Sequence, residues 1–147
     1  MRLAQHIETH IHTGDAADTV TLDYEARFLR RKRLVSDAGE PFLVELAETR
    51  SLNQGEGFRL DDGRIIAVIA AAEPLLAVRH GNLARIAWHV GNRHTPCQIA
   101  DDHILIREDK VLQAMLEGLG ASVTPVTAPF TPEGGAYGHG RTHGHEH

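Results

Sequence analysis

The chain has 147 residues, enough for one domain of average size or two small ones. Its formal net charge of −5 argues against general nucleic-acid binding, which requires a basic surface. No stretch approaches the roughly 18 apolar residues of a membrane-spanning helix. The single cysteine, Cys97, excludes an intrachain disulfide and favours a reducing compartment, so a cytoplasmic protein without a membrane partner is expected.

Residues 1–72 are predicted to form a small β-domain. Short apolar or β-branched runs of strand length alternate with turn sequences such as Asp37–Pro41 and Asp61–Gly63, and no helical period is present. The predicted strands lie at residues 19–22, 34–35, 42–46 and 65–70.

A local basic run interrupts this acidic chain within the β-domain. We interpret it as the solvated face of a surface strand, and a docking patch for an acidic protein partner is the alternative. The run consists of Arg27, Arg30, Arg31, Lys32 and Arg33.

Residues 73–130 are predicted to form a second domain. After a strand at 75–79, four apolar residues recur at the spacing of one helix face, and Gly91-Asn92 is expected to end that helix. Two short strands at 97–100 and 103–106 follow. The first helix face comprises Leu83, Ile86, Ala87 and Val90.

The second helix of this domain is expected to begin at Asp109, which is a good N-cap residue, and to end at Gly120. A last strand is expected at 122–126. The resulting β-α-β-β-α-β order is the ferredoxin-like arrangement, so the predicted fold class is α+β. The apolar stripe of the second helix comprises Val111, Leu112, Met115, Leu116 and Leu119.

Residues 131–147 are predicted to be an extended, mobile tail, because proline, glycine and histidine dominate and the last ten residues include no apolar side chain. Its alternating histidines suit a borderline metal ion such as Ni²⁺, Cu²⁺ or Zn²⁺, which neutral imidazole binds. A purification tag is the alternative, but the histidines form no uninterrupted run. They are His139, His143, His145 and His147.

His94 is the second candidate metal ligand. It follows Gly91-Asn92 on a short connector that Pro96 stiffens, so its ring can project outward. One histidine cannot satisfy a metal ion, but a two-fold axis brings a second His94 to the same ion. From the residues alone, a hydrogen-bonding role at the helix end is the favoured alternative.

Other polar residues of this region are assigned structural roles. Cys97 could chelate together with His94, although a lone cysteine in a strand more often fills space in the core. His80 and His103 are expected to be structural or solvated. The three histidines of the N-terminal segment are expected to be surface residues: His6, His10 and His12.

Three blocks in this order, together with the histidine-rich C-terminus, resemble the urease accessory protein E family, the nickel metallochaperones of urease maturation. They are His89–Pro96, Val111–Gly120 and Phe130–Gly138. The resemblance implies an N-terminal domain similar to a peptide-binding domain of heat-shock cochaperones, a ferredoxin-like metal-binding domain, and no enzymatic activity. It also implies a homodimer that delivers Ni²⁺ to a complex of apo-urease with accessory proteins, including a GTPase.

In this family the metal at the dimer interface is held by the histidine that matches His94, and tail histidines add ligands. Zinc or copper could take the place of nickel. The chain departs from the pattern at Arg107–Lys110, where some members carry an extra histidine pair. Two alternatives remain: a nickel or zinc store without a client protein, and a metal-dependent hydrolase, for which no motif of the HExxH kind is present.

Overall fold

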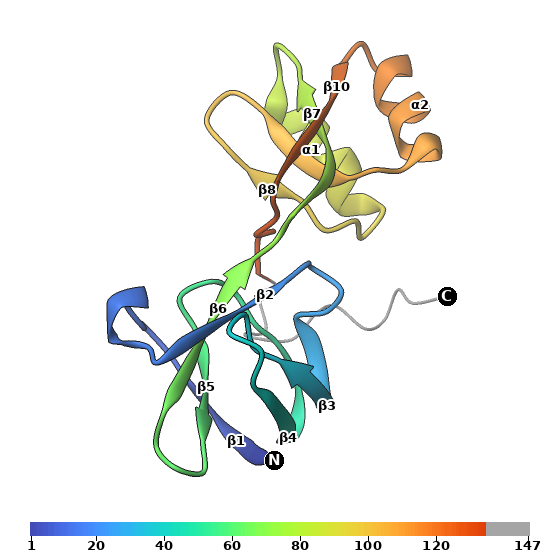
Figure 1. The fold of residues 1–147 in the computed structure, drawn as a ribbon. Coiled ribbons are helices and arrows are strands. Elements are labelled where there is room, and N and C mark those ends of the chain that lie inside the picture. Colours follow the sequence, from blue (N-terminus) through green and yellow to red (C-terminus); the bar gives the residue numbers. More distant parts are fainter. Residues whose placement is uncertain (135–147) are drawn as a thin grey trace. The chain divides into compact units, whose positions relative to one another are not determined.

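The computed structural model describes residues 1–134. These residues divide into two compact units, the first spanning Met1–Ala71 and the second beginning at Ala72 (Figure 1). The fold is mixed α+β: the first unit contains one six-stranded sheet, and the second contains a four-stranded sheet with two helices. No helix within the described part of the chain is long and apolar enough to cross a membrane.

The first unit is a curled sheet with the strand order β2-β6-β5-β1-β4-β3. β1 pairs with β4, and β2 with β6, in parallel, whereas the other neighbours are antiparallel. Each parallel pair joins strands far apart in the sequence. The elements are β1 (Arg2–Glu8), a 3-10 turn (Thr13–Asp15), β2 (Asp18–Leu22), β3 (Phe28–Val35), β4 (Pro41–Ser51), β5 (Gly57–Leu60) and β6 (Ile65–Ala70).

Alternation of buried and solvent-facing positions builds the core of this unit. Along β4, Phe42 and Val44 are fully buried, and the Phe42 ring lies 5.7 Å from that of Phe58 on β5. The curl brings the turn after β3 next to β2, where the backbone N–H of Asp37 donates to the carbonyl of Thr19 over 2.8 Å. The side chains of one sheet face therefore enclose a single apolar cluster.

The structure corrects two sequence-based predictions in this unit. β1 and β5 were not predicted. β1 carries no clear alternation of apolar residues, and β5 has only four residues, although Phe58 and Leu60 alternate with Arg59. Arg27 does not belong to the solvated basic run: it is fully buried, and its guanidinium donates to the carbonyls of Leu22 and Leu52, each over 3.0 Å. Its charge also lies over the ring of Tyr24. The remaining basic residues of the run are exposed on β3.

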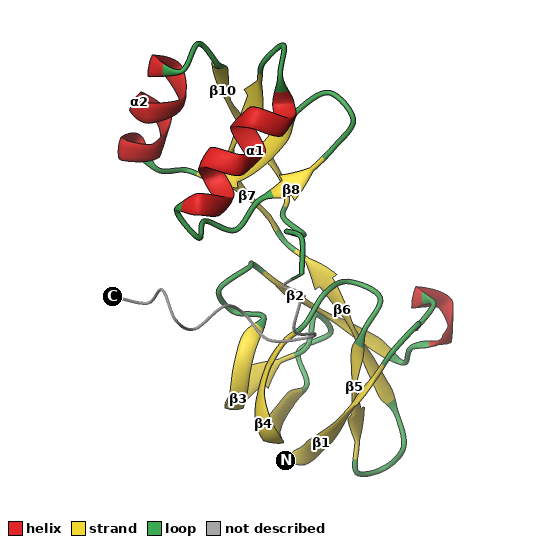
Figure 2. Ribbon diagram, turned by 180° about the vertical axis from the view of Figure 1, so that it is seen from behind, coloured by secondary structure: helices red, strands yellow, loops and turns green. Residues whose placement is uncertain are grey.

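The second unit has the predicted β-α-β-β-α-β order, and its antiparallel sheet has the strand order β10-β7-β9-β8. Figure 2 shows both helices on the same face of this sheet. The elements are β7 (Ala72–Arg79), α1 (Leu83–Asn92), β8 (Gln98–Ile99), β9 (Ile104–Arg107), α2 (Lys110–Gly118) and β10 (Ser122–Pro129).

The two helices bury the predicted apolar stripes against the sheet, with one exception. Ile86 and Val90 of α1, and Leu112 and Leu116 of α2, belong to one cluster with residues of β7 and β9. Val111 is 69% exposed, because it lies about 100° around the helix from Leu112 and so points away from the sheet.

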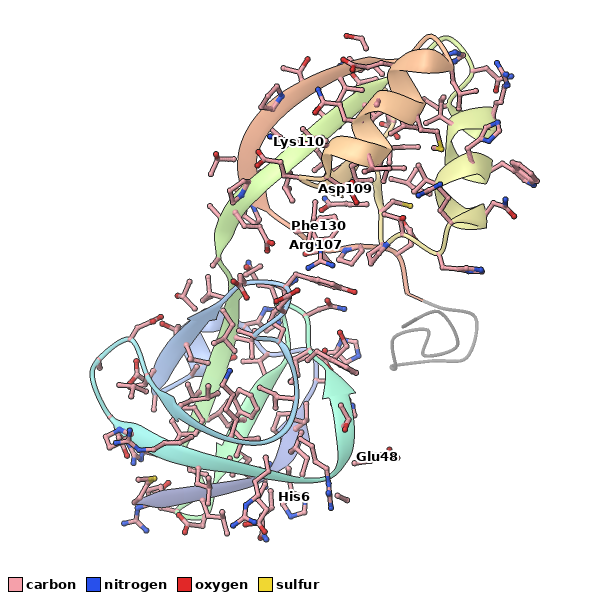
Figure 3. The ribbon with its side chains drawn as sticks, turned by 90° about the vertical axis from the view of Figure 1, so that its right-hand side faces the viewer. His6, Glu48, Arg107, Asp109, Lys110 and Phe130 are labelled. Carbon is pink, nitrogen blue, oxygen red and sulfur yellow. The ribbon has the colours of Figure 1, made fainter. Side chains whose placement is uncertain are left out.

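Asp109 begins α2 as predicted (Figure 3). Its Oδ1 accepts hydrogen bonds from the backbone N–H groups of Val111 and Leu112 over 2.9 and 3.0 Å. The carboxylate is thus engaged in capping the helix.

Candidate metal centre

His94 occupies the position that ends α1, and its backbone there is left-handed, with φ 58°. Its N–H donates to the carbonyl of Gly91 over 2.9 Å, and the N–H of Thr95 donates to that of Val90 over 3.3 Å. This pair of bonds is the Schellman motif, in which glycine usually takes the left-handed position. α1 ends at Asn92, as the predicted stop at Gly91-Asn92 requires, but the left-handed residue that terminates it is His94.

The end of α2 shows the same motif with glycine. Gly120, at φ 89°, donates to the carbonyl of Glu117 over 3.0 Å, and Ala121 donates to that of Leu116 over 3.0 Å. An L-residue in this conformation costs roughly 1–2 kcal/mol that glycine avoids. The chain thus places a histidine where its own second helix uses glycine, which points to a role for the His94 side chain other than helix termination.

The connector after His94 joins the core of the second unit. Cys97 is half-buried and packs against that core, as predicted for a core-filling cysteine. Burial raises the pKa of its thiol, and the nearby charge of Glu133 raises it further. Both effects disfavour the thiolate, which is the form that binds metals.

The residues after β10 return to this connector. The N–H of Glu133 donates to the carbonyl of Cys97 over 2.8 Å, and the N–H of Thr131 donates to the side-chain oxygen of Gln98 over 2.9 Å. Phe130, immediately before them, is fully buried. The start of the predicted tail is therefore fixed next to the segment that follows His94.

The exposed face of α1 carries the only tryptophan of the chain. Trp88 is 64% exposed, and its ring meets that of His89 edge-on, with centroids 5.0 Å apart. Ala84 and Gly91 lie on the same exposed face, about one helical turn before and one helical turn after Trp88. A large apolar side chain between two small residues suits the close approach of another surface.

The remaining histidines have the roles expected from the sequence. His80 Nδ1 accepts a hydrogen bond from the N–H of Asn82 over 2.8 Å, so its Nε2, which lies 3.2 Å from the carbonyl of Leu119, carries the proton. His103 Nδ1 lies 2.6 Å from Asp102, and this hydrogen bond lowers the pKa of that carboxyl. The three histidines of the N-terminal segment are exposed: His6, His10 and His12.

Within residues 1–134, no group of three or more histidine, cysteine, aspartate or glutamate side chains is arranged to hold a metal ion. A shallow depression of about 450 Å³ adjoins the connector and is lined by Glu73, Thr95, Pro96 and Arg107, among others. Asp109, also in its lining, already caps α2.

Each of the two units matches a domain of a known protein family. A model of the N-terminal domain of the UreE urease accessory protein matches residues 2–71, and a model of its C-terminal domain matches residues 73–147. The chain belongs to the UreE family. The resemblance inferred from the sequence is thereby confirmed, and with it a role as an accessory protein of urease.

Individual UreE proteins are similar over most of the chain. The urease accessory protein UreE of Ruegeria pomeroyi is 58% identical over 136 residues, which cover 92% of this chain and 91% of the relative. That of Cereibacter sphaeroides is 60% identical over 135 residues, covering 92% and 74%. That of Rhodobacter capsulatus is 61% identical over 132 residues, covering 90% and 84%.

The structure of this UreE chain describes one of the five predicted metal ligands. His94 is exposed at the end of α1. The other four lie in residues 135–147, outside the described residues: His139, His143, His145 and His147. Trp88 was not among the residues predicted from the sequence, although a lone tryptophan outside the apolar stripe of a helix was a usable signal. Gln98 and Glu133, whose contacts link distant parts of the chain, were not predicted either.

Proposed function

We propose that this UreE chain is a homodimeric nickel carrier that delivers Ni²⁺ to the urease activation complex, which contains apo-urease and an accessory GTPase. The observation that carries the proposal is the hydrogen bond between Glu133 and Cys97. Because Cys97 lies three residues after His94, the histidine-rich tail starts beside the connector that presents His94.

The length of the tail suits this arrangement. Starting from Gly134, His139 is five residues along the chain and His147 is thirteen. A glycine-rich chain has a root-mean-square reach of about 5–6 Å × √n, which gives roughly 12 Å and 20 Å for these two residues. Tethering at this range gives local imidazole concentrations of about millimolar at the connector.

A second copy of the chain would complete the site. Nickel requires four to six ligands, so a two-fold axis near the end of α1 would supply a second His94 to the same ion. The exposed Trp88 with its small neighbours provides an apolar surface on the same helix for such a dimer. A stable dimer interface buries at least about 1,000 Å², which requires residues around Trp88 as well.

The ligand set favours exchange over permanent retention. A structural zinc site is worth roughly 10–16 kcal/mol, too much for ready release. Imidazoles on a chain tethered at one end can be withdrawn one at a time, and micromolar affinity, about 8 kcal/mol, is sufficient for a carrier. Cu²⁺ should bind more tightly and Zn²⁺ comparably, so specificity for nickel must arise from metal availability and the docking partner.

Nickel transfer tests the proposal. Nickel-loaded protein is mixed with the accessory GTPase and the apo-urease complex in the presence of a weak nickel chelator, and urease activity is followed. The wild type and the control His103→Ala, which alters a histidine bonded to Asp102, should activate urease. His94→Ala should not. Equal activation by His94→Ala would contradict the proposal, and tight binding without transfer by the wild type would favour a storage protein.

A further inference from the structure

The edge of the first sheet carries an unusual row of charge. β3 is the last strand in the sheet order, and within the described residues it pairs on one side only, with β4. Four successive residues in its middle are cationic and exposed, in a chain whose net charge is −5. The basic edge comprises Arg30, Arg31, Lys32 and Arg33.

The first unit pairs its other exposed cations with carboxylates. None of the basic-edge residues takes part in an ion pair within residues 1–134, although Arg31 lies opposite Glu45 on β4. The arginine and lysine side chains of this unit that are exposed and lack an ion pair within the described residues are thus concentrated on one strand. By contrast, the arginines that pair with aspartate or glutamate side chains are Arg2, Arg50, Arg59 and Arg64.

The register of β3 places these charges on both faces of the sheet. Arg31 and Arg33 pair in register with Glu45 and Leu43, whereas Lys32 pairs with the fully buried Val44 and so belongs to the core-side face. A flat membrane surface or a helix that docks on one face would meet only part of this row. An extended strand added beside β3 would meet cations on both of its faces.

We propose that the basic edge is a docking site for an extended acidic segment of a partner protein, which adds to the sheet as a strand beside β3. Backbone hydrogen bonds would supply affinity, and carboxylates opposite the cations would supply selectivity. Cations on an edge strand also prevent two copies of the same edge from pairing. The same row therefore disfavours pairing between two copies of this edge and selects a segment of opposite charge.

An apolar position extends the site at one end. Val35, at the end of β3, is 51% exposed and pairs in register with Pro41. It lies two residues after Arg33, on the same face of the strand. The best segment therefore carries consecutive acidic residues followed by an apolar one. This site requires no metal and is independent of the nickel-carrier proposal, so the two can fail separately.

Titration of a synthetic peptide tests the site in the full-length, metal-free protein. The probe is an extended peptide of about ten residues, with three consecutive glutamates flanked by valine and threonine. Calorimetry should show binding that weakens as salt rises from about 50 to 500 mM. Hydrogen exchange should show new protection of β3 amides. Absence of binding at about 1 mM peptide in low salt would overturn the proposal.

Matched variants locate the charges. Arg31→Gln/Arg33→Gln should weaken peptide binding about tenfold, as expected for two lost cross-strand charge pairs. The control Arg2→Gln/Arg59→Gln removes the same net charge from other strands of the sheet and should leave binding unchanged. Lys32→Gln should also weaken binding. An unchanged affinity for Lys32→Gln would mean that only one face is used and would contradict strand addition.

The peptide backbone provides the second test. A paired strand uses only the amides along one of its edges, which belong to alternate residues. Of two peptides methylated at either the odd or the even nitrogens, one should therefore lose binding and the other should keep it. Equal binding of both methylated forms would show attraction by charge alone and refute strand pairing. Preferential binding of phosphatidylserine vesicles or a DNA duplex over the peptide would likewise refute an acidic protein segment as the ligand.

Discussion

Replacing His94 with glycine should separate the backbone role of this position from its metal-binding role. At φ 58° a side chain costs roughly 1–2 kcal/mol, and glycine removes this cost. Glycine in turn increases the entropy of the unfolded chain, at about 0.4–1 kcal/mol. The difference predicts a net stabilisation of the metal-free second unit by about 0–1.6 kcal/mol. For a unit of this size, each 1 kcal/mol raises the melting temperature by roughly 4–8 °C.

The same variant should lose the tightest nickel site. Loss of a group that merely orients a ligand typically lowers metal affinity 10–100-fold, so loss of the His94 imidazole should cost at least about 100-fold. Calorimetry of metal-free protein, followed by nickel titration, measures both effects. His10→Gly is the matched control, because His10 is also exposed and left-handed, with φ 57° in the first unit. It should leave nickel affinity unchanged.

Two outcomes of this experiment would refute the reasoning. A lower melting temperature for His94→Gly would mean that the side chain stabilises the helix end, as the favoured alternative from the sequence held. Unchanged tight nickel binding would mean that the metal is held elsewhere. Either result would remove the argument drawn from Gly120, which ends α2 in the same motif.

Three further predictions concern the tail, metal exchange and acid stability. Deleting residues 138–147 should lower the number of nickel ions bound per protein chain without changing the melting temperature of metal-free protein, because this segment has no apolar residue. A large loss of stability would show packing of this segment. Nickel affinity, measured by titration between pH 5.5 and 7.5, should fall steeply below about pH 6, since imidazoles bind metals only when neutral, and deletion of the tail should flatten this dependence. Arg64 hydrogen-bonds Glu40 over 2.7 and 2.6 Å and holds the pKa of that carboxyl below its usual range. The stabilisation of the fold by this pair is therefore present above the usual pKa of a carboxyl group and is lost as pH falls through the lowered pKa of Glu40. Arg64→Gln should thus lose less thermal stability than the wild type between pH 6 and 3. Identical profiles for the two proteins would contradict this.

Local patterns predicted the second unit well. The apolar spacing of Ile86 and Val90, the cap residue Asp109 and the glycine at 120 each act within one or two turns of chain, so the helices and their order follow from sequence. Val111 was wrongly included in the buried stripe of α2, because an apolar residue at the margin of such a stripe can face solvent.

Contacts between distant residues could not be predicted in the same way. The parallel pairing of β1 with β4, the burial of Arg27 and the bond from Glu133 to Cys97 depend on how separate segments meet. The left-handed backbone of His94 was also missed, because the preceding Gly91 offered a more conventional helix end. The geometry around His94 thus required the structure, whereas the histidine ligands stay a prediction from the sequence.

X-ray absorption of protein loaded with one nickel ion per proposed dimer tests the central claim most directly, because it counts imidazole ligands. The account predicts more imidazoles in the full-length protein than in the protein lacking residues 138–147, and loss of this nickel environment in His94→Ala. The same imidazole count with and without the tail would contradict the shared site and make the tail a separate metal store.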